Sequence, residues 1–162
     1  MSEAAPTPAP GKAHLAIHKG PDAEFTAGGL RFVACRREIA DIDGGISLYV
    51  WTAPAAGESQ ELLRFDLFRN RPHYHAPAEN QQETKIDPAS HADVAEWGVD
   101  ALTQHPATYV RQAGYDDVAA SLDAAALSNA TAGLRQLFDD LTEPDEVSYF
   151  EIDAKILESL RG

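Results

Sequence analysis

Two histidines, His73 and His75, stand two residues apart in the segment Pro72-His73-Tyr74-His75. In an extended strand, side chains two residues apart point to the same face, so both imidazoles can reach one metal ion or one substrate atom. Asp66 precedes them in an alternating run that also reads as a strand. A histidine near an aspartate can act as a general base close to neutral pH. We therefore name His73, His75 and Asp66 as candidate catalytic residues.

Metal binding is a second chemistry that these residue types predict. Imidazole and carboxylate ligands suit Zn, Fe, Mn or Ni, so the expected cofactor is a divalent transition metal. His73 and His75 would be two of the ligands. Glu79 or His91 would be the third.

An anionic small molecule is the ligand that the neighbouring residues predict. Arg64 and Arg71 can hold a carboxylate or a phosphate through paired N–H groups, and Tyr74 can donate a hydrogen bond. A simpler interpretation stays open. Arg64 and Asp66 share one strand face, where an ion pair between them would only order the sheet, and the histidines would hydrogen-bond their neighbours.

The same stretch resembles two known patterns. His73-Tyr74-His75-Ala76-Pro77-Ala78-Glu79 fits H-x-H-x-x-x-E and resembles part of the first cupin motif, which implies a metal held by His73, His75 and Glu79; Leu67 stands where that motif has a glycine. Leu63-Arg64-Phe65-Asp66, with Phe68 and Pro72-His73-Tyr74-His75, is similar to a signature of small uncharacterised bacterial domains. That resemblance implies that Arg64, Asp66, His73 and His75 belong together, and it implies no activity.

Composition excludes several classes of partner. The chain has 162 residues, with 13 Lys and Arg against 26 Asp and Glu, and a net charge of −13. Nucleic acids and anionic membranes bind through cationic surfaces, so we expect neither partner. No apolar run reaches the roughly 18 residues of a membrane span. Cys35 is the single cysteine, which favours a reducing cytoplasm.

The hydrophobic pattern predicts one α+β domain over residues 13–162, preceded by a disordered Ala/Pro-rich tail at 1–12. Residues 13–86 read mainly as strands, about five to six in an antiparallel meander, with Asp43-Gly44-Gly45 marking a hairpin. The period then changes to three and four, which predicts Ala-rich helices over 87–142, the first beginning at Asp87-Pro88. A strand at 147–152 should rejoin the sheet, and a short helix should follow at 153–161.

Strands followed by helices favour a sheet with helices packed on one face and the other face available for a site. We expect foremost a ligand- or partner-binding accessory domain that uses Arg64, Asp66, His73 and His75, acting as a homodimer or with a partner subunit. The alternatives are a small metal-dependent enzyme with His73 and His75 as ligands, and a metal-free His/Asp acid–base enzyme acting on an anionic substrate.

Overall fold

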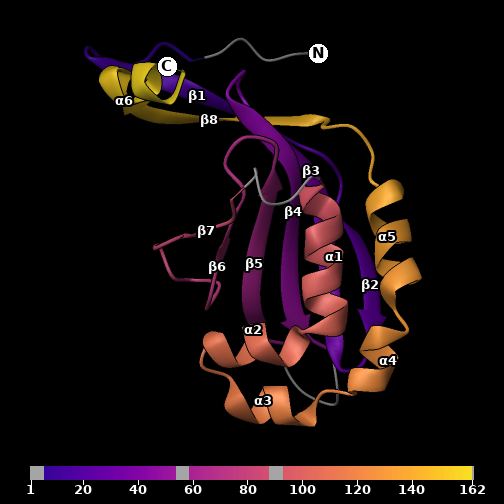
Figure 1. The fold of residues 1–162 in the computed structure, drawn as a ribbon. Helices are drawn as coiled ribbons and strands as arrows, with labels where there is room; N and C mark the ends of the chain where they lie inside the picture. The colour runs from indigo at the N-terminus through magenta and orange to yellow at the C-terminus, as the bar shows by residue number, and fades with distance from the viewer. Residues whose placement is uncertain (1–5, 54–58, 88–92, 162) are drawn as a thin grey trace.

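A computed structural model describes residues 6–53, 59–87 and 93–161 (Figure 1). Within these residues the chain forms an α+β fold in which every strand pairing is antiparallel. The strands are β1 (Lys12–Lys19), β2 (Ala23–Ala27), β3 (Leu30–Ile39), β4 (Asp43–Thr52), β5 (Glu61–Phe68), β6 (His73–His75), β7 (Thr84–Lys85) and β8 (Glu146–Asp153). The helices are α1 (Val94–Gln104), α2 (Pro106–Gln112), α3 (Asp116–Ser121), α4 (Ala124–Ser128), α5 (Thr131–Asp139) and α6 (Ala154–Arg161).

The strands form one sheet in the order β7-β6-β5-β4-β3-β1-β8, with β2 paired to β3. The predicted meander is confirmed from β3 to β7, and β8 rejoins the sheet beside β1 as expected. The expected five to six strands are too few, because the described residues form eight. None of the helices in the described ranges has the length and hydropathy to cross a bilayer.

Two element boundaries differ from the predicted ones. The turn between β3 and β4 uses Ala40, Asp41 and Ile42, with Ala40 at a φ of 47°, so the predicted hairpin glycines lie inside β4 instead. Gly45 has a φ of 153°, and a Cβ there would meet the carbonyl oxygen of Leu67, which explains a glycine in mid-strand. The first helix begins at Val94, where the Asp93 side chain accepts a hydrogen bond from the Glu96 N–H as its N-cap.

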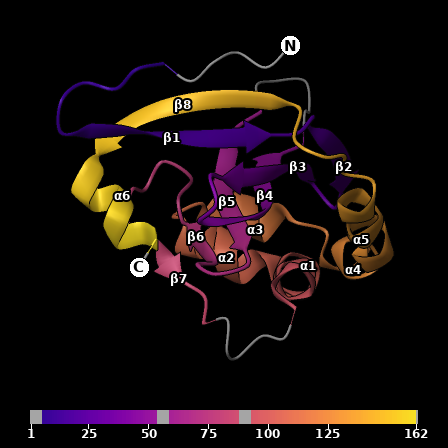
Figure 2. The same cartoon turned by 90° about the horizontal axis from the view of Figure 1, so that it is seen from above.

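One face of the sheet carries the hydrophobic core, and the helices cover it. Alternate residues of β5, namely Leu63, Phe65 and Leu67, are buried together with residues of α1, α2 and α5. Figure 2 shows α1 on one side of the central strands and the β1–β8 ribbon on the opposite side. The sheet therefore has a second face, free of these helices, on which the other alternate residues of β4, β5 and β6 project.

Phe65 lies at the centre of the core. It is fully buried, stacks on Tyr74 at a centroid distance of 5.1 Å, and contacts Tyr109 at 5.7 Å and Trp97 at 6.1 Å. This cluster links β5 and β6, the two strands that carry the candidate site, to α1 and α2. It thereby fixes the position of the site strands relative to the helices.

We predict that Phe65→Ala lowers the free energy of unfolding by about 3–5 kcal/mol, because it removes a buried aromatic ring and leaves a cavity. Phe150→Ala is the matched control, since Phe150 is 52% exposed, and it should cost less than about 1 kcal/mol. Urea denaturation followed by circular dichroism measures both values. Equal losses in the two variants would contradict this description of the core.

Candidate metal centre

Strand pairing brings Asp66, His73 and His75 together on the second face of the sheet. Asp66 of β5 lies opposite His73 of β6, and Arg64 lies opposite His75. Ser47 of β4 is the partner of Asp66 on its other side. Residues opposite each other in an antiparallel pair have Cβ atoms about 4.5–5.5 Å apart, close enough for direct side-chain contact. The register alone therefore builds this cluster, which we call the triad.

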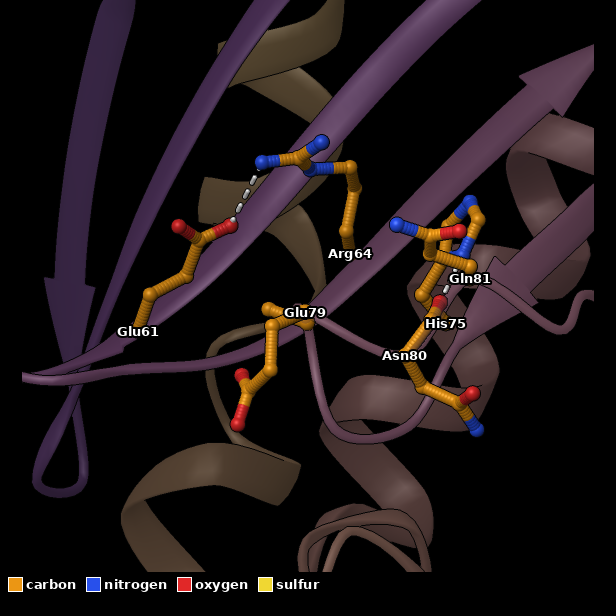
Figure 3. Close-up of a pocket in the computed structure, with 7 residues that line it drawn as sticks. Glu61, Arg64, His75, Glu79, Asn80 and Gln81 are labelled. Atoms are coloured by element: carbon orange, nitrogen blue, oxygen red, sulfur yellow. Dashed lines mark hydrogen bonds and ion pairs between the residues drawn. The ribbon is translucent and has the colours of Figure 1, made fainter.

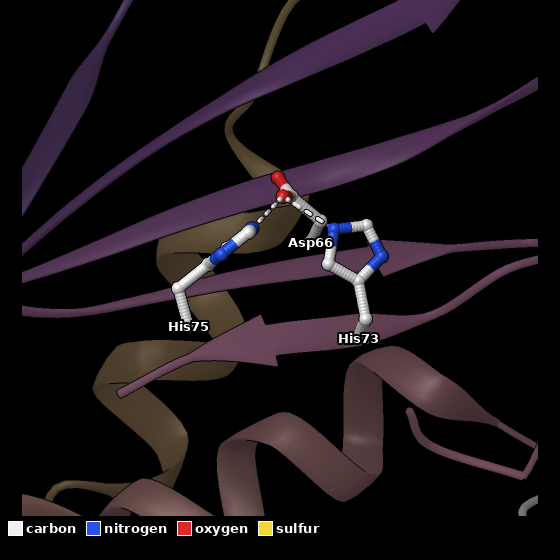
Figure 4. A group of neighbouring side chains, drawn as sticks. All are labelled: Asp66, His73 and His75. Carbon is white, nitrogen blue, oxygen red and sulfur yellow. Dashed lines mark ion pairs between the residues drawn. The ribbon is translucent and has the colours of Figure 1, made fainter. Parts of the chain in front are cut away.

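Both imidazoles point at one carboxylate oxygen (Figure 4). His73 Nε2 lies 3.0 Å from Asp66 Oδ2, and His75 Nε2 lies 3.7 Å from the same atom. The three side chains are 8%, 11% and 16% exposed for Asp66, His73 and His75. One ligand atom from each residue lies within 4.8 Å of the other two. The triad is thus a small, buried set of two nitrogens and one oxygen that face one another.

Backbone carbonyls hold the far sides of both rings. His73 Nδ1 lies 2.9 Å from the carbonyl oxygen of Arg71, and His75 Nδ1 lies 2.7 Å from that of Asn80. A carbonyl oxygen only accepts hydrogen bonds, so each Nδ1 carries a proton and donates it. In a neutral imidazole, Nε2 is then the unprotonated nitrogen. This pattern fixes both ring orientations and directs two lone pairs toward Asp66.

An unprotonated Nε2 beside a carboxylate oxygen places two electron-rich atoms against each other. The arrangement is stable only if a positive charge lies between them, either a proton that makes the ring cationic or a metal ion. His73 Nε2 at 3.0 Å from Asp66 can share a proton, whereas the 3.7 Å from His75 is too long for a hydrogen bond. Metal bonds of about 2.0–2.2 Å place neighbouring ligand atoms about 3.0–3.4 Å apart, close to both separations.

The pKa values of the pair reflect the same attraction. Burial by itself raises the pKa of Asp66, but hydrogen bonds from His73 and Ser47, together with the charges of His73 and Arg37, outweigh it and lower the pKa overall. Burial likewise lowers the pKa of His73, but Asp66, the Arg71 carbonyl and Glu83 outweigh it, and the net pKa is raised. Without a metal, His73 therefore keeps its proton to a higher pH than a free imidazole does, and Asp66 stays ionised to a lower pH than a free carboxyl, so that an imidazolium–carboxylate pair is favoured.

Ser47 completes the support of the carboxylate. Its hydroxyl donates a 2.7 Å hydrogen bond to Asp66 Oδ1, and its side chain is fully buried. This bond orients Asp66 so that Oδ2 faces the histidines. Because Ser47 is buried and contacts the aspartate, its role is to position the Asp66 carboxylate.

Arg64 and Glu79 line a neighbouring pocket, which we call the Arg64 pocket (Figure 3). It has a volume of about 290 Å³ and also includes His75, Glu61, Ala78, Asn80 and Gln81. The Arg64 guanidinium lies over the Tyr49 ring at 4.9 Å and is 3.3 Å from Glu61. Of the two open interpretations, the ion pair between Arg64 and Asp66 is wrong, since Arg64 pairs with Glu61, whereas Asp66 contacts His73. Asp66, in place of Glu79, completes the set of three ligand atoms.

The remaining predicted site residues lie in different surroundings. Tyr74 projects to the helix-covered face, where its hydroxyl donates a 3.0 Å hydrogen bond to Gln112, so it does not reach the triad. Arg71 is exposed, and its side chain lines a pocket beside His73. His91 lies outside the described residues.

Sequence reasoning missed Ser47, Glu83 and the carbonyl of Asn80. Glu83 Oε1 is 3.5 Å from His73 Nε2, which adds a second carboxylate near the triad. Ser47 had a usable signal, because a small polar residue interrupts the apolar run of β4. Glu83 and Asn80 had none, since a loop brings them to the site.

The shifted pKa values predict a pH-dependent stability of the metal-free protein. Because the pKa of His73 is raised in the folded protein, its interactions stabilise the fold fully below about pH 6.5. This stabilisation is lost as the pH rises through the pKa of His73 in the folded state. The lowered pKa of Asp66 contributes stability above about pH 3.9 and loses it as the pH falls. Asp66→Asn should therefore lower the free energy of unfolding most, by about 3 kcal/mol, between about pH 4 and 6.5. The loss should be smaller at pH 8 and at pH 3.

Urea denaturation of wild type and Asp66→Asn across this pH range, with a chelator present, measures the difference. Asp145→Asn is the control, because Asp145 is exposed. A stability difference that stays constant from pH 4 to pH 8 would show that the imidazolium–carboxylate pair does not form.

Comparisons with known proteins add a family. Among curated proteins and among solved structures, nothing matches the chain. A family model described as a domain of unknown function (DUF7700) matches residues 24–137, more than half of the chain. The matched region contains Ser47 and the whole triad, while β1, β8 and α6 lie outside it. The chain belongs to this family, DUF7700.

Proposed function

We propose that this protein is a binding domain whose functional centre is a divalent transition metal ion held by Asp66, His73 and His75. One observation carries the proposal. All four ring nitrogens of the two histidines face oxygen acceptors, with Nδ1 on backbone carbonyls and Nε2 on Asp66 Oδ2. Zn, Fe, Mn and Ni all accept this combination of imidazole and carboxylate.

Three protein ligands leave coordination positions open, which is the arrangement of metal sites that bind a further molecule. The bound ion would polarise that molecule or lower the pKa of a bound water. Glu83 lies close enough to His73 to be a further ligand or to accept a proton beside the ion. The expected anionic small molecule is consistent with such a centre, because an anion is attracted to the cation.

A metal-free acid–base pair is the second candidate. The 3.0 Å contact between His73 and Asp66 and the raised pKa of His73 favour it. In that case His73 would transfer protons, and the imidazolium would take the place of the metal charge. His75 then lacks a clear role, since its Nε2 lies 3.7 Å from Asp66.

Location and association remain predictions from the sequence. A reducing cytoplasm is supported by Cys35, which is a buried free thiol. A homodimer or a partner subunit is supported by Phe150 and Ile156, the large apolar side chains exposed in the described ranges. Light scattering of the purified chain tests the association.

We predict that wild type, purified without a metal-affinity tag, binds one equivalent of Zn²⁺ in a calorimetric titration at pH 7. His73→Ala and His75→Ala should each weaken binding by more than about a hundredfold, because each removes a ligand, whereas losing an outer-shell partner costs about 10–100-fold. His18→Gln should bind like wild type, since His18 is exposed on β1, away from the triad.

Wild type that takes up less than about a tenth of an equivalent, with no rise in melting temperature on adding Zn²⁺, Mn²⁺ or Ni²⁺, would rule out the metal centre. The same result would leave the acid–base pair as the better proposal. Circular dichroism of each variant confirms that its fold is retained.

A further inference from the structure

A second pocket adjoins the triad on the His73 side. It has a volume of about 440 Å³ and is lined by Asn70, Arg71, Pro72, His73, Glu83, Lys85 and Ile86. We call it the Arg71–Lys85 pocket. Because His73 lines it, a molecule in this pocket lies next to the triad. Pro72 and Ile86 add apolar surface, and both are buried.

The strand register places Lys85 beside His73. Lys85 of β7 is the antiparallel partner of His73 of β6, so the two side chains project to the same face. Arg71 lies two residues before His73, and its carbonyl oxygen accepts the hydrogen bond from His73 Nδ1. The two cationic side chains therefore approach one imidazole from a neighbouring strand and from the preceding turn.

Arg71 and Lys85 bring two unpaired positive charges to one pocket of a chain whose net charge is −13. Of the 13 Lys and Arg side chains, all of which lie in the described residues, six form an ion pair with an acidic side chain. Such ion pairs are formed by Lys19, Arg31, Arg64, Arg69, Arg135 and Arg161. Arg71 and Lys85 are both exposed and have no side-chain hydrogen bond or ion pair within the described residues. They concentrate uncompensated positive charge at one place.

Glu83 is the one acid among the described residues that line this pocket. Its Oε1 lies 3.5 Å from His73 Nε2, and it forms no ion pair with Arg71 or Lys85. The Arg64 pocket differs, because there Glu61 and Glu79 outnumber the one arginine. The charge balance thus separates the two pockets on either side of the triad, and it favours an anion on the His73 side alone.

We infer that the Arg71–Lys85 pocket binds a small oxyanion, a carboxylate or a phosphate group, between the Arg71 guanidinium and the Lys85 ammonium. Arginine can grip such a group with two N–H donors, and lysine adds a compact point charge. The inference deepens the proposed function by naming the class of ligand, and it rests on that proposal where the oxyanion also reaches a metal ion at His73. The Arg71 guanidinium and the Lys85 ammonium can bind the oxyanion even when no metal ion is bound at His73.

The test titrates metal-free protein, in chelator at pH 7 and about 150 mM salt, with inorganic phosphate and separately with acetate. Backbone amide shifts of Arg71, His73 and Lys85 in NMR spectra report binding. We expect saturable binding of at least one anion. Arg71→Met and Lys85→Met should each weaken it about tenfold, the loss expected for one charge-assisted hydrogen bond.

Lys155→Met is the control, since Lys155 is exposed on α6 and its removal changes the net charge equally. It should bind the anion like wild type. Binding that Arg71→Met and Lys85→Met leave unchanged, or no saturable binding of either anion, would overturn the inference. If metal titration fails while anion binding still depends on Arg71 and Lys85, the metal centre alone is wrong. If metal binds and neither substitution matters, the oxyanion pocket alone is wrong.

Discussion

The need to compensate the buried charge of Asp66 governs the second face of the sheet. An ionised carboxylate removed from water is costly unless hydrogen bonds and a positive charge replace its solvation. Ser47 supplies a hydrogen bond to one oxygen, and His73 and His75 converge on the other. The carbonyls of Arg71 and Asn80 then fix the rings from behind. The contacts thus form one continuous network, from Ser47 through Asp66 and the two imidazoles to the backbone carbonyls.

The fold separates this polar construction from the core by the simplest property of a strand. Successive residues of β5 face opposite sides, so Phe65 joins the aromatic cluster under α1 and α2 while Asp66 joins the triad. The same alternation in β6 places Tyr74 in the core between the two histidines. A rigid aromatic core therefore lies directly behind the candidate site. That arrangement suits a centre whose ligand atoms must be held to within tenths of an ångström.

Alternation and period predicted the fold well, and they predicted which face carries His73 and His75. They left the partner of Asp66 open between the histidines and an ion pair with Arg64. Residues two apart on one strand are separated by nearly 7 Å along the strand, whereas direct cross-strand neighbours are nearer. The cross-strand partner depends on register, which a single sequence does not reveal. It pairs Asp66 with His73 and Tyr49 with Arg64, so the arginine stacks on an aromatic ring and turns to Glu61.

Other differences have equally local causes. Two glycines in a row suggested a turn, yet Gly45 is needed inside β4 because a side chain would collide with the backbone of β5. Glu83 reaches His73 from a loop, and no periodicity of the sequence encodes a loop path. Lys85 was visible as a basic residue, but its place opposite His73 follows from the pairing of a strand only two residues long. The residues that the hydrophobic pattern could not place near the site thus lie in a loop and in a very short strand.

The central claim is that both histidines present Nε2 to a shared cation beside Asp66. Nitrogen-15 NMR of the imidazole rings, recorded before and after adding one equivalent of Zn²⁺, tests it directly. We predict Nδ1–H for both rings throughout, and a simultaneous shift of both Nε2 resonances to metal-bound values. Protonation of Nε2 with an unprotonated Nδ1 on either ring, or Nε2 signals that Zn²⁺ leaves unchanged, would contradict it.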